Sequence, residues 1–483
     1  GNVTLILLDY ENTKQSDLIP ARNQLVKLLH QMQPNDRVAL YALAGRLYVL
    51  HDFTSDMASL LKAIDTYWSP DSVDASYENT PPVFGSARND PGMDAFINLA
   101  KQRFSDFAAI NRAETTTQAF EAIADHVMRI PGRKNLVWIS SAFPLSIGLD
   151  KEGNNSYMAA YQSDAGGAGM RPSNFSGPAT SLTTGSEGLY IQESRQFDQE
   201  LERAVRALGN ANIAIYPVDA RGLIGSGTDS AVINGNQSPY FSPTTFQAPG
   251  YRSAIYADSF DTMNALATRT GGAAYYNTND IGGSISKAMD DARVSYMIAY
   301  YPDHDDWNGK FHRLRLTTTR PGVSLHYRSG YFAQPPDYVE NLKTAQVWRT
   351  AMSSPLDATG VGVSVHVEPK EALEARTMVM EVVVNESDVS FNHEGDRTTG
   401  RLEVVLAQYD KEGIPVVSET SEVKMELDRD TYSKARKEGL HFGRILPISA
   451  KAAEVRVFVR DTKSNAIGSV SLPVNLVFKP KTN

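Results

Sequence analysis

The sequence contains no cysteine among its 483 residues. This absence excludes disulfide bonds, zinc–thiolate sites, iron–sulfur clusters and thiol nucleophiles. It does not identify a compartment, because proteins without disulfides occur in every compartment. No apolar run reaches the roughly 18 residues that a membrane-spanning helix needs. No signal peptide is visible, but the chain enters its first predicted strand at Val3. We therefore expect that an export signal has been removed and that the protein is secreted or lies in the cell envelope.

Motifs that mark common enzymes are also missing. The sequence has no Gly-x-Ser-x-Gly elbow, no His-Glu-x-x-His zinc motif and no Walker loop, and its nine histidines are scattered. We therefore expect a protein that is not an enzyme. An excess of basic residues is absent as well, since the formal net charge is −9. Binding to nucleic acid or to an anionic membrane through bulk charge is thereby disfavoured.

The composition, 41% hydrophobic and 21% charged, is typical of two or three globular domains. Strand and helix patterns alternate through residues 1–294 and predict an α/β domain with a doubly wound, mostly parallel, six-stranded sheet. An early hairpin supplies its antiparallel strand. The predicted strands are 3–9, 37–43, 46–51, 135–140, 212–219 and 273–276. The helix before the fourth strand is expected to begin near Gln118.

The pattern changes after residue 294. Runs at 295–301 and 311–317 flank an Asn-Gly turn and predict a β-hairpin, so that residues 295–335 form an extension. Several carboxylates precede that turn, but their spacing favours a solvated hairpin tip over a calcium loop. Residues 344–483 contain six or seven short strand patterns separated by turn residues. They predict a third domain, an Ig-like antiparallel β-sandwich.

A candidate metal site follows the first predicted strand. The apolar run ends at Asp9, and Glu11 and Thr13 place oxygen atoms at every second position after it. Open α/β sheets bind ligands at the carboxyl ends of their strands. Three oxygen donors there suit weak binding of a hard cation, Mg²⁺ or Ca²⁺. The alternative is that these polar groups only cap the following helix and hold the turn.

Several motifs resemble those of a known family. The Asp9-x-Glu11-x-Thr13 loop, the stretch from Pro131 to Ser140 and the stretch from Tyr327 to Tyr331 are similar to segments of von Willebrand factor A-like proteins. They resemble most a divergent subfamily that is abundant in acidobacteria. The resemblance covers residues 3–333 and implies the von Willebrand A fold.

The resemblance also implies a metal site made from three loops. A threonine that precedes the helix near Gln118 would join the first loop, and Thr115 is the expected residue. An acid should follow the fourth strand, but Ser140 and Ser141 stand there, so the resemblance implies a degenerate metal site. Glu11 either compensates for the missing acid or fills the site.

Three long insertions, 66–113, 143–192 and 221–257, are expected on the face that carries Asp9. They combine aromatic residues with Ser, Gly and Asn, a composition typical of adaptable binding loops. We expect the contact residues to be Tyr157, Tyr161, Tyr190, Tyr240, Phe241 and Tyr251.

These patterns predict an extracytoplasmic binding or adhesion-type module whose partner is a protein or another copy of the chain. The first alternative is a self-assembling subunit of a surface layer or filament. The second is a hydrolytic enzyme that uses Asp9, Glu11 and Asp219.

Overall fold

A computed structural model describes residues 3–30, 36–67, 91–141, 200–223, 249–291, 310–323, 325–333, 344–372 and 375–478, together with several short pieces between these ranges. In the helical residues 91–107 and 249–259 only the backbone is described. The chain divides into two units. Residues 1–121, 132–303 and 311–332 form the first unit, and residues 122–131, 304–310 and 333–483 form the second.

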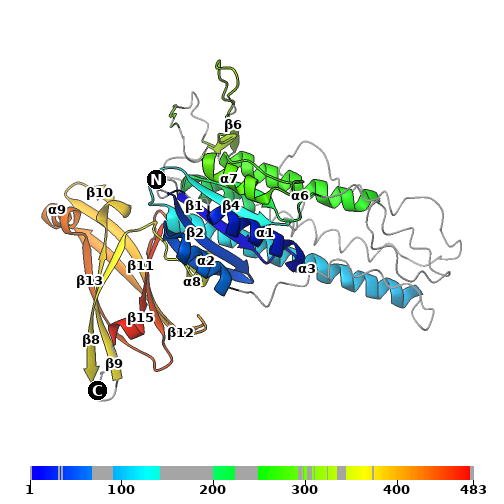
Figure 1. Cartoon of the computed structure of the whole chain (residues 1–483). Coiled ribbons are helices and arrows are strands. Elements are labelled where there is room, and N and C mark those ends of the chain that lie inside the picture. The colour runs from blue at the N-terminus through cyan, green and yellow to red at the C-terminus, as the bar shows by residue number, and fades with distance from the viewer. Residues whose placement is uncertain are drawn as a thin grey trace. The chain divides into compact units, whose positions relative to one another are not determined.

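The first unit is built on a five-stranded sheet with the order β3-β2-β1-β4-β5 (Figure 1). All its neighbouring strands are parallel except β2 and β3, which are joined by a turn at Gly45. Every residue of β1, β4 and β5 is buried, as expected for strands covered on both faces. The strands are β1 (Val3–Asp9), β2 (Arg37–Ala44), β3 (Arg46–Thr54), β4 (Lys134–Ser140) and β5 (Ile213–Asp219).

The prediction of a sixth strand at residues 273–276 is wrong. Tyr275 forms only a single parallel bridge with Val218. Just before it, Gly272 approaches β5 so closely that a Cβ atom would lie 1.9 Å from a backbone carbonyl oxygen. Just after it, Asn277 adopts a left-handed conformation with φ 55° and turns the chain away. The segment is therefore too short to extend the ladder.

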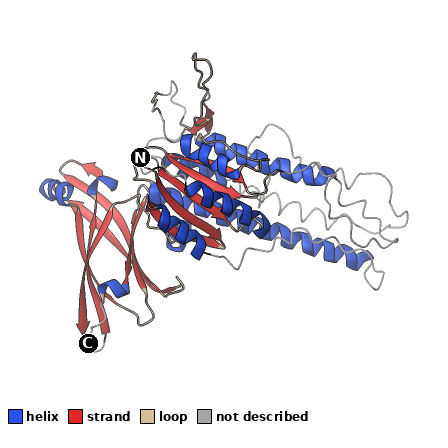
Figure 2. Cartoon of the chain, viewed as in Figure 1, coloured by secondary structure: helices blue, strands red, loops and turns tan. Residues whose placement is uncertain are grey.

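Helices cover both faces of this sheet (Figure 2). Leu25, Leu60 and Ile285 bring three helices into one core with the β1 residues Ile6 and Leu8. These helices are α1 (Gln15–Leu29), α2 (Met57–Thr66) and α7 (Ile281–Asp291). On the opposite face, α3 (Pro91–Val127) places the ring of Phe120 edge-on to Trp138 of β4, at 5.3 Å between ring centroids. None of the helices in the described ranges has the length and hydrophobicity that crossing a bilayer requires.

Two helices are longer than the sequence patterns predict. The helix expected near Gln118 begins at Pro91, so α3 includes much of the insertion 66–113. The second is α6 (Pro249–Thr270), which begins inside the insertion 221–257. Both continue past the carboxyl ends of the strands in Figure 1.

The predicted hairpin between 295–301 and 311–317 is not formed. Instead, β6 (Phe311–Arg313) pairs with β7 (Gly330–Phe332) in an antiparallel two-stranded sheet. Gly330 permits this pairing, since a Cβ atom there would lie 2.2 Å from a backbone oxygen of β6. The described residues of 295–301 have no strand partner, and Tyr296 and Tyr301 are 87% and 95% exposed.

The second unit contains two antiparallel sheets, in agreement with the predicted β-sandwich. One sheet holds β10 (Asn392–Glu394), β11 (Arg397–Tyr409), β12 (Pro415–Leu427), β14 (Glu454–Asp461) and β15 (Ile467–Pro473). The other holds β8 (Val363–Ala372), β9 (Ala375–Val384) and β13 (Leu440–Pro447). Alternate residues of both sheets, such as Met380 and Val457, share one core. The helical elements of the second unit include α8 (Thr344–Ser353), η3 (Glu386–Asp388), α9 (Arg429–Glu438) and α10 (Val474–Val477).

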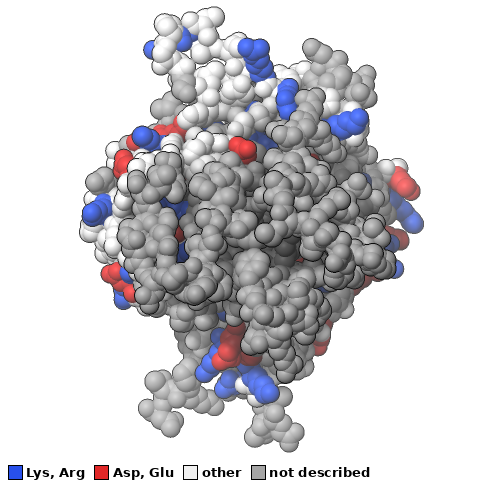
Figure 3. Space-filling view, turned by 90° about the vertical axis from the view of Figure 1, so that its right-hand side faces the viewer, with Lys and Arg blue, Asp and Glu red and all other residues white. Residues whose placement is uncertain are grey.

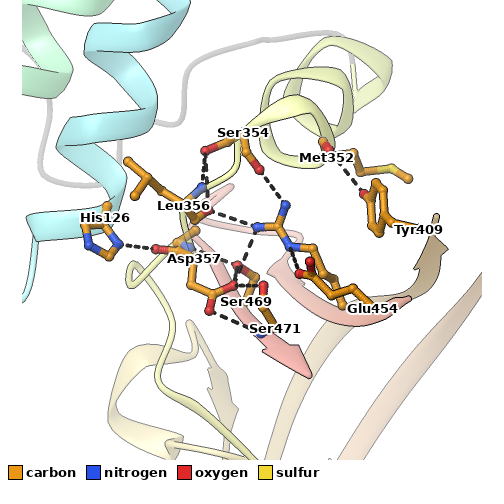
Figure 4. A network of polar contacts seen from close by, with 11 residues as sticks. His126, Met352, Ser354, Leu356, Asp357, Tyr409, Glu454, Ser469 and Ser471 are labelled. Carbon is orange, nitrogen blue, oxygen red and sulfur yellow. Dashed lines mark hydrogen bonds and ion pairs between the residues drawn. The ribbon is translucent and has the colours of Figure 1, made fainter. Parts of the chain in front are cut away.

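A polar network holds the segment after α8 against β14 and β15 (Figure 4). The side chain of Arg456 is 5% exposed, and its guanidinium donates to the carbonyl oxygens of Ser354 and Leu356. The carboxylate of Asp357 accepts hydrogen bonds from the side chains of Ser469 and Ser471 at 3.0 and 2.8 Å. A buried arginine is tolerated only when such acceptors replace its water, so this network is structural.

Candidate functional site at the carboxyl edge of the sheet

Polar side chains stand at the carboxyl ends of three neighbouring strands of the first unit, β1, β4 and β5. Asp9, Ser140 and Asp219 are the last residues of β1, β4 and β5. In the parallel register, Ser140 lies opposite Asp219. The residues just before these positions, Leu8, Ile139 and Val218, are apolar and buried, so the polar groups of the three strand ends meet at the edge of the sheet.

Asp9 is fully buried and accepts four hydrogen bonds. Its Oδ1 accepts the backbone N–H of Asn12 at 3.0 Å. Its Oδ2 accepts the Asn12 side-chain amide, the Trp138 indole N–H and the Ser140 hydroxyl, each at 2.9 Å. Burial raises the pKa of Asp9 from 3.8 to about 6, although these hydrogen bonds act in the opposite direction.

Asn12 connects this carboxylate to α3. Its Nδ2 donates both to Asp9 Oδ2 and to Thr116 Oγ1, at 2.9 Å in each case. Thr116 is fully buried, whereas the hydroxyl of Thr115, the expected residue, bonds back to the carbonyl of Asn111. The threonine hydroxyl that meets the Asp9 loop therefore belongs to Thr116, and a ligand role for Thr115 stays a prediction. Sequence reasoning missed Asn12 because it followed only the alternate positions 9, 11 and 13 of the loop.

The other two expected ligands of the first loop point elsewhere. The carboxylate of Glu11 accepts the backbone N–H of Gly45, at the turn between β2 and β3. Thr13 is buried, and its Oγ1 accepts the backbone N–H of Ser141 at 2.9 Å. Glu11 therefore does not stand in for the acid that is missing after β4.

Two clusters of aromatic and arginine side chains flank the Asp9 loop. In the first, which we call the Arg221 cluster, the Arg221 guanidinium pairs with both oxygens of Asp219 at 2.9 Å. It also lies 5.3 Å from the ring centroid of Phe260, which stacks on Tyr276 at 4.4 Å. Burial raises the pKa of Asp219, and its pairing with Arg221 opposes that shift.

The second, the Arg46 cluster, lies on the other side. The guanidinium of Arg46 sits 4.8 Å from the ring centroid of Tyr48. Tyr67 contacts both Tyr48 and Tyr10, at 5.8 and 5.7 Å between ring centroids. Arg46 is exposed, while the three tyrosines pack against the core of the first unit. Tyr67 belongs to the aromatic set of the insertions, and Arg46 was not anticipated.

The arrangement at Asp9 does not fit a divalent cation. A cation needs several oxygen lone pairs that converge on one point. Here, Asp9 is engaged by four donors, Thr13 by a backbone N–H, and Thr116 by the amide of Asn12. Within the described ranges, no group of three or more His, Asp or Glu side chains is placed to hold a metal ion.

The expected aromatic contact residues and the carboxylates before the Asn-Gly turn fall largely outside the described residues. This holds for Tyr157, Tyr161, Tyr190, Tyr240 and Phe241. Tyr251 lies in α6, in the part where only the backbone is described.

The helix α3 extends well beyond this edge. Thr116 meets the Asp9 loop, and α3 begins 25 residues earlier at Pro91. At 1.5 Å per residue, about 37 Å of helix stands beyond the ends of the strands. Figure 3 views the molecule from this side. On the described residues visible there, acidic and basic side chains are interspersed, so this part of the face presents no extended field of one sign.

Comparison with known proteins gives no family assignment. No protein-family model matches the chain. No curated protein matches it either.

Solved structures give several weak matches. An aerotolerance-related membrane protein from Bacteroides fragilis is 15% identical, with 60% of this chain and 100% of that chain covered and a TM-score of 0.26. The PilB minor pilin from Streptococcus sanguinis is 9% identical over 60% of this chain and 61% of that chain, with a TM-score of 0.25. The type V pili tip protein Mfa5 from Porphyromonas gingivalis is 10% identical over 98% and 70%, with a TM-score of 0.30. Likenesses with such low TM-scores establish neither a family nor a function.

Proposed function

We propose that the chain is an extracytoplasmic, adhesion-type binding module that contacts a protein partner with the carboxyl edge of its five-stranded sheet. The observation that carries this proposal is the pair of aromatic–arginine clusters on either side of the Asp9 loop. Tyrosine and arginine, together with tryptophan, are the residues enriched at the energetic centres of protein interfaces.

The spacing of the two clusters supports this reading. Arg46 begins β3 and Arg221 follows β5, so four strand separations lie between them. At about 4.8 Å per separation, the clusters are roughly 19 Å apart. A patch of this width fits within one side of a standard protein interface, which buries about 800 Å². The two helices α3 and α6 extend past the same edge (Figure 1).

The state of the carboxylates at this edge favours binding over catalysis. A general base has to come within hydrogen-bond distance of its substrate. Asp9 is 0% exposed, and Asp219 is 1% exposed and held by Arg221. Glu11 is engaged by the backbone of Gly45. The raised pKa of Asp9 therefore follows from burial within the fold, and we propose a non-enzymatic role.

Site-specific crosslinking tests the proposal, because a chain without cysteine can be labelled at any chosen position. Lys14→Cys places a benzophenone label at the carboxyl edge, in the loop after β1 and outside both clusters. Arg37→Cys is the control, an exposed basic residue at the start of β2 and therefore at the opposite edge of the same sheet. Both labelled proteins are irradiated with the cell-envelope fraction of the native organism.

We expect the label at position 14, and not the one at 37, to capture one discrete protein, and unlabelled wild type to compete for it. Mass spectrometry then tells a foreign partner from a second copy of the chain. Equal capture from both positions, or none that the wild type competes for, would contradict the proposal.

A self-assembling subunit is the second candidate function. It is favoured by the side chains of Tyr296, Ile298 and Tyr300, which are 87%, 69% and 51% exposed. Exposed, alternating apolar residues without a strand partner tend to pair with another chain. Light scattering that rises with protein concentration in the wild type, but not after Ile298→Lys, would support it. A monomer at all concentrations would exclude it.

A further inference from the structure

We infer that the side-chain amide of Asn12 takes the place of a divalent cation at the carboxyl edge, so that the loop after β1 is held without metal. The resemblance noted for this loop implies a cation that draws together an aspartate, two hydroxyls and a threonine from a second loop. In this chain the aspartate and that threonine are drawn together by one amide group. The loop is held in this way whatever the protein binds.

The amide uses both of its hydrogens for this bridge. One is donated to Asp9 Oδ2 and the other to Thr116 Oγ1, with both donor–acceptor distances 2.9 Å. The orientation of the threonine is set independently, because its own hydroxyl hydrogen is donated to the carbonyl of Arg112 at 2.8 Å. Its lone pair is thereby left for the amide. The hydrogen bond to the Arg112 carbonyl thus orients Thr116 Oγ1 as an acceptor for the amide of Asn12.

The carbonyl oxygen of the same amide, Asn12 Oδ1, is in an unfavourable environment in this orientation. Asn12 Oδ1 is buried and has no hydrogen-bond partner among the described residues. An unpaired buried carbonyl is unfavourable. The reverse orientation would be worse, since it would set an oxygen against the oxygens of both Asp9 and Thr116. The bridge therefore dominates the placement of this side chain.

An isosteric substitution tests the inference. Asn12→Asp keeps the size of the side chain but replaces the donor NH₂ with an oxygen. Two carboxylates would then face each other beside Thr116, an arrangement that needs a cation. The matched control is Asn23→Asp, the same chemical change at an exposed position of α1. Thermal unfolding of the full chain is measured near pH 8 in EDTA and with about 10 mM Mg²⁺, Ca²⁺ or Mn²⁺.

We expect the Tm of wild type and of Asn23→Asp to be the same in EDTA and in metal. Asn12→Asp should melt lower in EDTA and regain stability with metal. A cation at ten times its Kd raises the Tm of a unit of this size by roughly 3–6 °C. If Asn12→Asp does not fold, Asn12→Ala, which removes the bridge and adds no charge, is measured in the same way.

Three results would overturn the inference. The first is metal binding by the wild type that Asp9→Asn abolishes, because a cation would then bind at Asp9 in the presence of the Asn12 amide. The second is an Asn12 variant as stable as the wild type in EDTA. The third is a destabilised Asn12 variant that no metal restores, since the amide would then be an ordinary loop contact.

Discussion

The buried carboxylate of Asp9 leads to a quantitative prediction about stability and pH. Burial raises its pKa from 3.8 to about 6, so the folded protein binds this proton more tightly than the unfolded chain does. The wild type therefore loses stability as the pH rises from about 4 to 6. The full shift corresponds to about 3 kcal/mol, of which about 2.5 kcal/mol falls between pH 4 and 7.5.

The substitution Asp9→Asn removes this dependence. It also carries a constant cost of about 1–3 kcal/mol, because an amide NH₂ has to face one of the four donors around this position. The difference between wild type and variant separates the two effects. The wild type should be more stable near pH 4, and its advantage should shrink by about 2.5 kcal/mol by pH 7.5. The control is Asp65→Asn, an exposed carboxylate of the same unit.

The free energy of unfolding of this unit is measured by urea denaturation at several pH values. Hydrogen exchange of peptides from β1 and β4 reports the unfolding. The Trp138 indole N–H gives a second signal, since it donates directly to Asp9. Its resonance should titrate near pH 6 in the wild type and not in the variant. A stability difference that is constant within about 0.5 kcal/mol across this range would refute the reasoning.

Four further predictions follow from individual contacts. Thr116→Val should lower the free energy of unfolding by about 1–2 kcal/mol, because it strands the amide of Asn12, whereas Thr115→Val should change it by less than about 0.5 kcal/mol in the same urea titration. Burial raises the pKa of Asp125 from 3.8 to about 7, so the stability of Asp125→Asn relative to the wild type should rise by about 4 kcal/mol between pH 4 and pH 8.5 in the same titration. Asp357→Ala should destabilise the second unit by about 2 kcal/mol, because Arg456 and two serine hydroxyls lose their acceptor; no change in its urea midpoint would contradict Figure 4. Residues 344–483 should fold alone, and a disordered or mainly helical circular dichroism spectrum would disprove this.

The local pattern of apolar residues was sufficient to predict the strands that carry the candidate site. The apolar run before Asp9 predicts a fully buried strand, and β1 is one. The polar residues that end β1 and β5 were expected at the carboxyl edge and lie there. The strand patterns after residue 361 likewise predicted the two antiparallel sheets. In each case the signal is the spacing of apolar residues along a few positions of chain, which is a property of the sequence itself.

Contacts between distant segments decided the rest. Adjacent residues of a helix point about 100° apart, so the sequence alone does not show which threonine faces the Asp9 loop, and in the structure it is Thr116. The sixth strand was lost because Gly272 brings the chain too close to β5, and the hairpin was lost because β6 pairs with β7. The role of Asn12 has no signal in the sequence. An asparagine after a strand becomes a bridge only when the fold sets a carboxylate and a hydroxyl, 107 residues apart in sequence, within 3 Å of its amide.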